Sequence, residues 1–381
     1  MKNGFMQTFN EQGQNLKRVL HILASLNIGG AESRIMDIYR NIDRNLIQFD
    51  FVVHSSEGFY EDEARSLGAE IYQCESFTPR NLFRYIQWWR NFFHKKTYET
   101  IHGHMISSSA IYMYLARINH VNQRILHARS GAKNGFIRSI LIYIGKKQAN
   151  LLLAVSKKSA NAVFGYRSKV KVIYNPTNYQ KYIFSEEKRR EVRKTLGIQK
   201  SEFLIGHVGR FHAVKNHSFI LEVFHKFSKK VNAKLVLIGD GNQKNHIFNR
   251  IDKLQIKNKV FWIKQTSDVG QYLSAMDCFI FPSKHEGFPG SLIEAQISNL
   301  PILASDTITK EVKVTQHLNY LPIQHLSVWL RKLQGIYETY QNCDRTFDNK
   351  SQFTEFDIKN VVKNHQYLYL DYNFYQENKN E

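Results

Sequence analysis

Short apolar runs alternate along most of the chain with longer segments in which apolar residues recur at helical spacing. A short run of this kind predicts a buried strand, and the longer segment after it predicts a helix that covers the sheet. Repeated alternation of strand and helix is typical of parallel sheets with helices on both faces. The strands expected in the first half are Val19–Ala24, Phe49–His54, Glu70–Gln73, Thr100–His102, Arg124–His127, Leu151–Val155 and Val170–Tyr174, and the helices are Ala31–Ile42, Tyr60–Leu67, Leu82–Phe93 and Ser107–Ile118.

A polar and charged stretch separates this series from a second one, with Asn175-Pro176 as a breaker and a mixed-charge helix expected at Glu186–Leu196. Two doubly wound, Rossmann-like α/β domains are therefore expected, residues 1–177 and 178–345, followed by a closing helix and frayed tail in residues 346–381. Such sheets bind ligands beyond the carboxyl ends of their strands, so a central cleft is the expected site. The second series comprises strands at Phe203–Val208, Lys234–Ile238, Val260–Ile263, Cys278–Phe281 and Pro301–Ala304, and helices at Asn216–Lys229, Gln243–Leu254, Val269–Ala275 and Gly290–Ile297.

The amino-acid composition indicates which kinds of binding partner to expect. The 381 residues include 53 Lys and Arg against 33 Asp and Glu, a formal charge of +20, and 43% of them are hydrophobic. That hydrophobic share suits globular domains and excludes a largely disordered chain. The charge indicates an anionic partner: nucleic acid, an anionic membrane surface or a phosphorylated substrate. Because no zinc-finger spacing, RNP-like aromatic box or Ser/Arg-rich tail is present, nucleic acid is not the expected partner.

Cysteine usage and the apolar runs predict a location. Cys74, Cys278 and Cys343 are too few and too scattered for a disulfide framework or a cysteine zinc site, which favours a reducing compartment. Met1–Lys17 is polar, so no signal peptide is expected there. No apolar run approaches the roughly 20 residues that span a bilayer. A cytoplasmic protein is expected.

The most informative stretch is Phe281–Gln296, which reads FPSKHEGFPGSLIEAQ. A loop after an expected strand carries Glu286, and the helix that follows is expected to carry Glu294 in its first turn. Gly287 and Gly290 allow the backbone to approach a ligand closely, and the helix N-terminus offers free N–H groups. Two carboxylates at this opening can bind sugar hydroxyls. The structural alternative is a capping loop with one glutamate near the helix dipole.

A second stretch, His207–His217, reads HVGRFHAVKNH and joins an expected strand to an expected helix. Gly209 lies at the turn, Arg210 at the strand exit and Lys215 at the helix start. Two cations and helix N–H groups at one point suit a diphosphate. Solvated surface cations are the alternative in so basic a chain, but the position at the carboxyl end of a strand favours phosphate contact.

The first strand is followed by Gly29-Gly30, which on its own indicates only a turn. The G-x-G-x-x-G spacing is missing, and no acidic residue ends the second strand in the dinucleotide manner. NAD is therefore not an expected ligand.

Together these stretches resemble the retaining glycosyltransferases of family four, which have the GT-B fold of two Rossmann-like domains facing a central cleft. The resemblance extends from about Arg18 to Pro322 and is closest to enzymes of bacterial capsule and exopolysaccharide synthesis. In GT-B proteins a C-terminal helix, here within Phe353–Tyr375, returns to the first domain. The matching segments are NIGGAE at 27–32, HVGRFHAVKN at 207–216, LVLIGDG at 235–241 and AMDCFIFPSKHEGFPGSLIEA at 275–295.

The resemblance implies a role for each matching residue of the second domain. Arg210 and Lys215 are expected to hold the diphosphate of the sugar donor. Glu286 is expected near the donor sugar, with a catalytic role, and Glu294 on the nucleotide ribose. The loop residues expected to reach the sugar are Phe288, Pro289, Gly290 and Ser291.

In the first domain, the resemblance places Gly29 and Gly30 near the phosphates and the acceptor. It also places a histidine that ends a strand at the reaction centre, for which His102 and His104 are both available. His104 is preferred because it stands just before the expected helix Ser107–Ile118. A core or surface histidine is the alternative for either one. The loop RSGAKNGF, Arg129–Phe136, lies on the acceptor side and carries no motif that can be interpreted.

The implied reaction moves a sugar, with retention, from a nucleoside-diphosphate sugar, expected to be a UDP-sugar, to a lipid-linked or saccharide acceptor. The chain has no Asp-x-Asp sequence, which agrees with a reaction that needs no metal and no cofactor. Cations and helix N-termini then stabilise the leaving diphosphate. Front-face attack is expected, with the departing phosphate accepting the proton of the acceptor.

Basic residues mix with aromatic ones in Pro79–Lys96 and Lys133–Lys147. Such segments can rest on an anionic leaflet, where each surface cation contributes about 1 kcal/mol. We therefore expect peripheral association with the inner face of the cell membrane. An amphipathic helix packed on the sheet with a solvated basic edge is the alternative.

Two other functions are compatible with the architecture. A nucleotide-sugar epimerase would need no acceptor. A non-catalytic sugar-nucleotide-binding scaffold subunit of a polysaccharide assembly complex predicts broken donor motifs, whereas Arg210, Lys215, Glu286 and Glu294 are all present. The transferase is the preferred interpretation.

Overall fold

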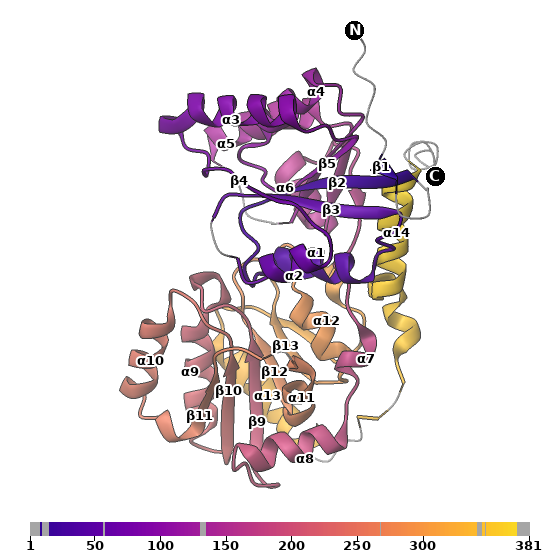
Figure 1. Ribbon diagram of the computed structural model, residues 1–381. Coiled ribbons are helices and arrows are strands. Elements are labelled where there is room, and N and C mark those ends of the chain that lie inside the picture. The colour runs from indigo at the N-terminus through magenta and orange to yellow at the C-terminus, as the bar shows by residue number, and fades with distance from the viewer. Residues whose placement is uncertain are drawn as a thin grey trace. The chain divides into compact units, whose positions relative to one another are not determined.

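The chain folds into two compact units in the computed structural model (Figure 1). Unit 1 comprises residues 1–176 and 355–381, and unit 2 comprises residues 177–354. The sequence predicts domain boundaries after residues 177 and 345. The residues that the structure describes are 8–9, 15–55, 58–129, 135–266, 268–340, 345–346 and 348–371.

Unit 1 is built on an eight-stranded sheet whose order is β4-β3-β2-β5-β6-β7-β8, with β1 paired to the start of β2. β1 is antiparallel to β2 and the other pairs are parallel, as the alternation of strands and helices predicts. The strands are β1 (Thr8–Phe9), β2 (Asn15–Leu23), β3 (Ile47–Val53), β4 (Ile71–Gln73), β5 (Thr100–Gly103), β6 (Gln123–Ala128), β7 (Leu151–Ala154) and β8 (Lys171–Val172).

Helices cover both faces of this sheet. One apolar core lies under α1 (Gly30–Asn41), α2 (Glu61–Ser66) and α14 (Ile358–Leu370). The other lies under α3 (Leu82–Lys95), α4 (Ser109–Ile118), α5 (Phe136–Gln148) and α6 (Lys157–Phe164). The C-terminal helix α14 is part of unit 1, where the Gln123 side-chain amide donates to the carbonyl of Leu368 at 2.7 Å.

Unit 2 contains a six-stranded parallel sheet in the order β11-β10-β9-β12-β13-β14. α9, α10 and α13 cover the face whose core includes Phe224 and Trp329. The strands are β9 (Phe203–Val208), β10 (Ala233–Ile238), β11 (Val260–Ile263), β12 (Cys278–Phe281), β13 (Ile302–Ser305) and β14 (Leu318–Leu321). The helices are α7 (Tyr179–Tyr182), α8 (Glu186–Thr195), α9 (His217–Phe227), α10 (Lys244–Lys253), α11 (Val269–Ala275), α12 (Gly290–Ile297) and α13 (Leu326–Tyr340).

The strand order reverses once in each sheet, between β2 and β5 in unit 1 and between β9 and β12 in unit 2. At such a switch point the connections leave toward opposite faces, so the carboxyl ends of the two strands border a crevice that binds ligands. The segments after these four strands are therefore the places to search for a site.

Candidate functional site

In unit 2, the segment after β9 is held against the segment after β10 by backbone hydrogen bonds. The N–H of Gly209 donates to Ile238 O at 3.0 Å, and the N–H of Phe211 donates to Asp240 O at 2.8 Å. Gly239 has a φ of +140°, and a Cβ there would lie 2.2 Å from the carbonyl oxygen of Gly209. Only glycine fits this position, which explains the first glycine of the LVLIGDG segment.

The turn that follows places Lys215 at the crevice. Ala213–Lys215 form a short 3₁₀ helix, and the His212 side chain accepts from the N–H of Val214 at 3.3 Å. Asn216 then adopts the left-handed conformation, with φ 58° and ψ 45°, and α9 begins at His217. The Lys215 side chain is 18% exposed. Arg210 is exposed at the strand exit.

The loop after β12 is joined to this turn. The N–H of Lys284 donates to Val214 O at 2.8 Å, and the Asn216 amide donates to Pro282 O at 3.3 Å. The Nζ atom of Lys215 lies 2.7 Å from Oε1 of Glu286 and 4.8 Å from the centre of the Phe281 ring. The structure thus pairs two of the residues that the sequence singled out, from two motifs about seventy residues apart.

The other glutamate of this stretch does not lie in the first helical turn. α12 begins at Gly290, so Glu294 is its fifth residue and the first turn carries no acidic group. The prediction was wrong because a helix that begins at Gly290 places residue 294 in its second turn. Glu294 is 5% exposed. Phe288 and Pro289 are also buried, Gly290 and Ser291 are half-buried, and no side chain caps the N-terminus of α12, whose N–H groups can donate to the oxygen atoms of a ligand.

A buried histidine ties the two strands at this switch point. His207 on β9 is fully buried, and its Nδ1 lies 2.9 Å from the carbonyl oxygen of Ile280 on β12. Burial lowers the pKa of His207, with the charge of His217 and Lys215 adding to the effect, so the ring is neutral and its Nδ1–H donates. His207 therefore joins the two strands as a neutral hydrogen-bond donor.

In unit 1, the segment after β2 leads into α1 through Gly29 and Gly30. Gly29 is the N-cap residue in an extended conformation, and its carbonyl accepts from the N–H of Ser33 at 3.0 Å. A Cβ built on Gly30 meets nothing within 4 Å. The space in front of this helix N-terminus is open, and the backbone there does not itself require glycine.

His104 follows β5 at the same switch point, and its backbone N–H donates to Ile22 O at 3.0 Å. Nε–H of Arg129 donates to His104 Nδ1 at 3.0 Å, and His104 Nε2 lies 3.2 Å from His21 Nδ1. Burial and the Arg129 charge lower the pKa of His104, so the ring is neutral. Because Nδ1 accepts from Arg129, the single ring proton is on Nε2 and is donated to His21.

His102 occupies a different position from His104. It is fully buried, with Nδ1 2.7 Å from the Tyr369 hydroxyl and Nε2 3.0 Å from His127 Nδ1. A substrate cannot reach it without displacing the core, whereas His104 is half-buried. Its accessibility supports the choice of His104 over His102.

Nitrogen atoms of His21, His102 and His104 lie within 4.8 Å of one another, close enough to hold a metal ion. The hydrogen bonds argue against that use. The Nδ1 lone pair of His104 is taken by Arg129, and its Nε2 carries the proton, so neither nitrogen can ligate. The neighbouring guanidinium also opposes a second cation. Among the described residues this is the one group of three or more potential ligands, and its geometry fits a hydrogen-bonded relay better than a metal centre.

The structure also identifies a residue of the site that no sequence motif indicated. Arg129, with its Nη1 donating to Asn175 Oδ1 at 3.0 Å, orients His104, and it lies at the start of the segment in which no motif was found. Residues 130–134 of that segment lie outside the described residues. The available signal was position: Arg129 comes directly after β6, at the same edge of the sheet as His104.

Comparison with known proteins agrees with this geometry. Residues 28–181 match the family described as Glycosyltransferase Family 4, and residues 188–319 match the one described as Glycosyl transferases group 1. The chain therefore belongs to the family four glycosyltransferases with the GT-B fold.

Its relatives and structural neighbours give more detail. The chain is 29% identical to the putative glycosyltransferase EpsF of Bacillus subtilis over 310 residues, covering 78% of this chain and 81% of EpsF. It is 26% identical over 321 residues to the capsular polysaccharide biosynthesis glycosyltransferase CapH of Staphylococcus aureus, covering 79% and 84%. A shorter match, 28% over 142 residues, covers 36% of this chain and 37% of the Escherichia coli UDP-Gal:α-D-GlcNAc-diphosphoundecaprenol α-1,3-galactosyltransferase. The crystal structure of Anabaena HepE with UDP has the same fold, with a TM-score of 0.74 at 17% identity over 92% of this chain and 99% of HepE.

Proposed function

We propose that this protein transfers a sugar from a nucleoside-diphosphate sugar to a lipid-linked or saccharide acceptor in the synthesis of a capsule, exopolysaccharide or other surface glycan. The observation that carries the proposal is the Lys215–Glu286 pair beside the uncapped N-terminus of α12 at the switch point of unit 2. EpsF and CapH support a polysaccharide product. HepE, crystallised with UDP, supports a UDP-sugar donor, and the E. coli galactosyltransferase supports a diphospholipid acceptor.

In this proposal, Arg210 and Lys215 hold the donor diphosphate, and Lys215 neutralises the charge that develops when it leaves. Glu286 contacts the donor sugar and keeps the Lys215 ammonium in place. Glu294 binds the ribose. No metal or cofactor takes part, because the cations and the α12 N–H groups supply the positive charge. Transfer retains the anomeric configuration by front-face attack, and a product of inverted configuration by NMR would contradict this step.

UDP is expected to stabilise unit 2 against heat, and the stabilisation is expected to be lost in Glu294→Ala. A ligand near a hundred times its Kd stabilises the native state by about 2.7 kcal/mol, roughly 5–10 °C for a domain of this size. A thermal-shift panel of UDP, GDP, ADP and UDP-sugars, each with EDTA, measures the effect and identifies the base.

Glu202→Gln is the matched control for this panel. Glu202 is also a buried glutamate of unit 2, 9% exposed, but it precedes β9 and lies at the amino end of the sheet. It is expected to keep the full shift with UDP. If no nucleotide shifts the wild-type protein, the non-catalytic scaffold becomes the better interpretation.

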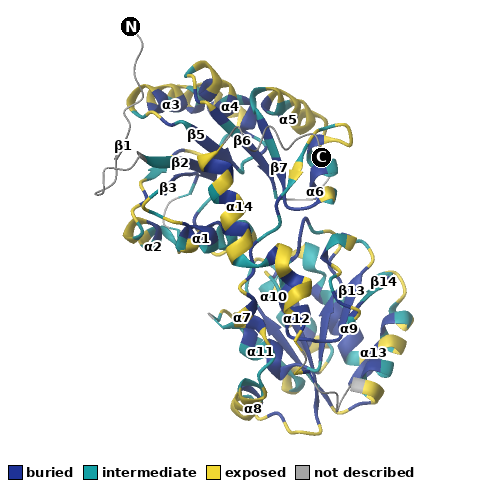
Figure 2. Ribbon diagram, turned by 90° about the vertical axis from the view of Figure 1, so that its right-hand side faces the viewer, coloured by how far each residue is buried: buried dark blue, intermediate teal, exposed yellow. Residues whose placement is uncertain are grey.

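Peripheral membrane association is the second part of the proposal, and the structure revises the segments that carry it. Of the two segments named from the sequence, Pro79–Lys96 contributes less than expected, because Trp89, Phe92 and Phe93 are buried in the core under α3. Much of α5 is instead exposed (Figure 2), and several of its exposed residues are large and apolar. Its exposed large side chains are Phe136, Ile137, Ile140, Tyr143 and Ile144, with the cations Arg138 and Lys147 also exposed on the helix. No described helix is both long and apolar enough to span a bilayer.

Vesicle flotation tests this surface. Wild-type protein is expected to float with vesicles that contain anionic lipid at low salt, and Phe136→Asp/Ile137→Asp is expected to remain at the bottom, because it places two charges on side chains that are 82% and 75% exposed. Phe59→Asp, at an exposed phenylalanine before α2, is the control and is expected to float. Wild-type protein that stays at the bottom with every vesicle would end the membrane proposal.

A further inference from the structure

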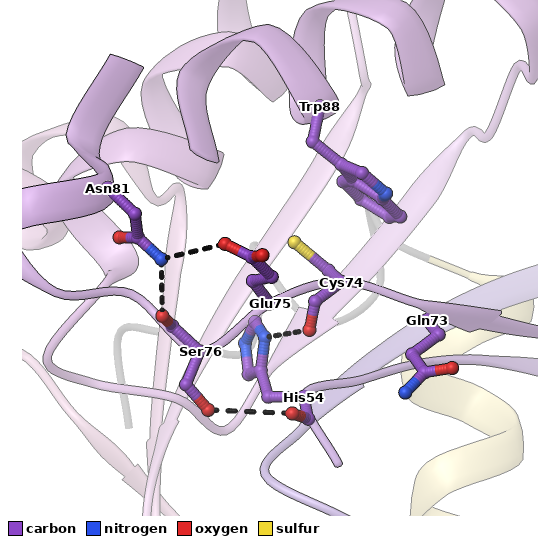
Figure 3. A pocket seen from close by; sticks show the side chains of 7 residues that line it. All are labelled: His54, Gln73, Cys74, Glu75, Ser76, Asn81 and Trp88. Carbon is purple, nitrogen blue, oxygen red and sulfur yellow. Dashed lines mark hydrogen bonds between the residues drawn. The ribbon is translucent and has the colours of Figure 1, made fainter. Parts of the chain in front are cut away.

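A polar pocket lies in unit 1, outside the switch point between β2 and β5. It has a volume of about 580 Å³ and opens at the carboxyl ends of β3 and β4 (Figure 3). His54 comes directly after β3, Gln73 is the last residue of β4, and Trp88 reaches the pocket from α3. The residues that line it are His54, Gln73, Cys74, Glu75, Ser76, Asn81 and Trp88.

His54, in the lining of this pocket, carries a hydrogen-bond acceptor without a partner. Its Nδ1 lies 3.2 Å from the carbonyl oxygen of Cys74, which can only accept, so Nδ1 carries a proton. Burial lowers the pKa of His54, so the ring is neutral and Nε2 holds a lone pair. The residue is 8% exposed, and Nε2 is buried with no partner among the described residues. A buried acceptor without a donor is costly, and because this atom has almost no accessible surface, a ligand hydroxyl or N–H group would satisfy it only after the ring turns toward the pocket.

The carboxylate of Glu75 is held at the mouth of the same pocket. The Asn81 amide donates to Glu75 Oε2 at 3.3 Å and to Ser76 O at 2.9 Å, and Asn81 Oδ1 in turn accepts from the N–H of Thr78 at 2.8 Å. Arg84 lies 3.6 Å from the carboxylate, and both side chains are exposed. Arg84 is thus already paired, and the described residues that line the pocket include no Lys or Arg, so the pocket offers acceptors rather than positive charge, which disfavours an anionic ligand.

Trp88 supplies an apolar wall. Its ring stacks on Phe92 with centroids 5.2 Å apart and an interplanar angle of 8°, and it packs edge-on against Trp89 at 5.0 Å. These contacts fix the orientation of the half-buried ring. Cys74 adds no charge, because burial raises the pKa of its thiol to about 12.

A fixed aromatic face beside two hydrogen-bond acceptors matches a pyranose ring, which has an apolar C–H face and a rim of hydroxyl donors. We propose that this pocket is a saccharide subsite in which sugar hydroxyls donate to His54 Nε2 and to the Glu75 carboxylate while the ring lies on Trp88. The inference rests on the proposed function, since the sugar bound there is a residue of the acceptor or of the growing glycan.

Saturation-transfer NMR on the full chain, with a panel of methyl glycosides of glucose, galactose and N-acetylglucosamine, tests the subsite directly. Transfer to sugar protons is expected for the wild type. Glu75→Gln and Trp88→Leu are each expected to weaken binding roughly tenfold, as the loss of one charge-assisted hydrogen bond or one aromatic contact implies. Both changes are at accessible positions, so they avoid the folding risk of replacing buried His54.

Glu70→Gln is the matched control. Glu70 is an exposed glutamate of unit 1 that is also paired with a cation, with Lys96 Nζ at 2.8 Å, but it precedes β4 and lies at the opposite edge of the sheet. It is expected to bind glycosides as the wild type does. Absence of transfer from every glycoside, or equal binding by all variants, overturns the subsite.

The UDP thermal shift separates this result from the proposed function. A protein that responds to UDP but binds no glycoside retains the donor site and loses the subsite. A protein that binds glycosides through Trp88 and ignores every nucleotide retains the subsite and loses the transferase proposal.

Discussion

Lys215→Met is expected to lower kcat by about 10²–10³-fold, the usual effect of removing one charged or hydrogen-bonding group that stabilises a transition state. The change keeps the aliphatic stem but removes the ammonium 2.7 Å from Glu286. The Glu286 carboxylate then lacks its cation in a site where a diphosphate must accept more negative charge. The lost ammonium and the unpaired carboxylate both raise the activation barrier, and loss of the ammonium also weakens binding of the donor. Initial-rate kinetics with the donor identified by thermal shift measure kcat and KM separately.

Lys244→Met is the control for this variant. Lys244 is also a half-buried lysine of unit 2 that stands over an aromatic ring, with Nζ 4.0 Å from the centre of Trp262, but no described carboxylate forms an ion pair with it. Its kcat is expected to stay within about twofold of the wild type, as for most surface changes. Glu286→Gln is expected to cost less in the Lys215→Met background than alone, because the pair acts as one unit. A Lys215→Met enzyme with wild-type kcat would remove Lys215 from the reaction.

Acidification is expected to unfold unit 1 between about pH 6 and pH 4, because four histidines with at most 2% exposure must gain protons. The pKa values of His21, His102 and His127 lie well below their ordinary 6.5, and that of His365 is about 4, with burial as the main cause for each. A lowered folded pKa means that the unfolded chain binds more protons once the pH falls below 6.5. Each such group then removes up to about 1.4 kcal/mol of stability per pH unit, so four remove up to about 5.6 kcal/mol per pH unit, comparable to the whole stability of a domain.

Urea unfolding at a series of pH values, followed by tryptophan fluorescence, measures this loss. His365→Gln removes one titrating ring and leaves its neighbours in place. The variant is therefore expected to take up about one proton fewer on unfolding, which lowers the slope of the unfolding free energy against pH. His94→Gln, at an exposed histidine of α3, is the control and is expected to leave the slope unchanged. A stability that does not change from pH 7 to pH 5 would show that the histidines do not stay neutral in the folded state.

The strands and helices of unit 2 could be located closely from the apolar pattern. β9, β11, α11, β12 and α12 begin and end where the sequence predicts, because each is a continuous apolar run or a well-bounded amphipathic segment. The pattern failed for β14 and α13, which it did not assign. β14 (LNYL) is an edge strand that mixes apolar and polar residues, so it does not stand out as an apolar run. α5 was noticed only for its basic and aromatic residues, because an exposed apolar face hides the helical period.

Site residues were predictable where they belong to one local segment and not where they depend on pairing across the sheet. The loop that carries Glu286 and the turn that carries Lys215 were each recognisable, and their parallel strands explain why they meet. The roles of Arg129 and His54 depend on partners twenty or more positions away, His104 and Cys74, so no local spacing indicates them. What the sequence did show was that His54 ends a predicted strand and that Arg129 lies just after one, which in a parallel sheet is enough to justify attention.

The position of α14 in the sequence has a consequence for the order in which the two units fold on the ribosome. Unit 2 is one continuous segment, residues 177–354, and it is synthesised before α14. Unit 1 begins the chain but needs its last helix, because Tyr369 meets His102 and the Leu368 carbonyl satisfies Gln123 in the centre of the sheet. The usual sequence, in which the N-terminal domain folds first, is therefore reversed. Until α14 has been synthesised, one face of the first unit stays uncovered, and a chain that stops short of residue 358 cannot close it.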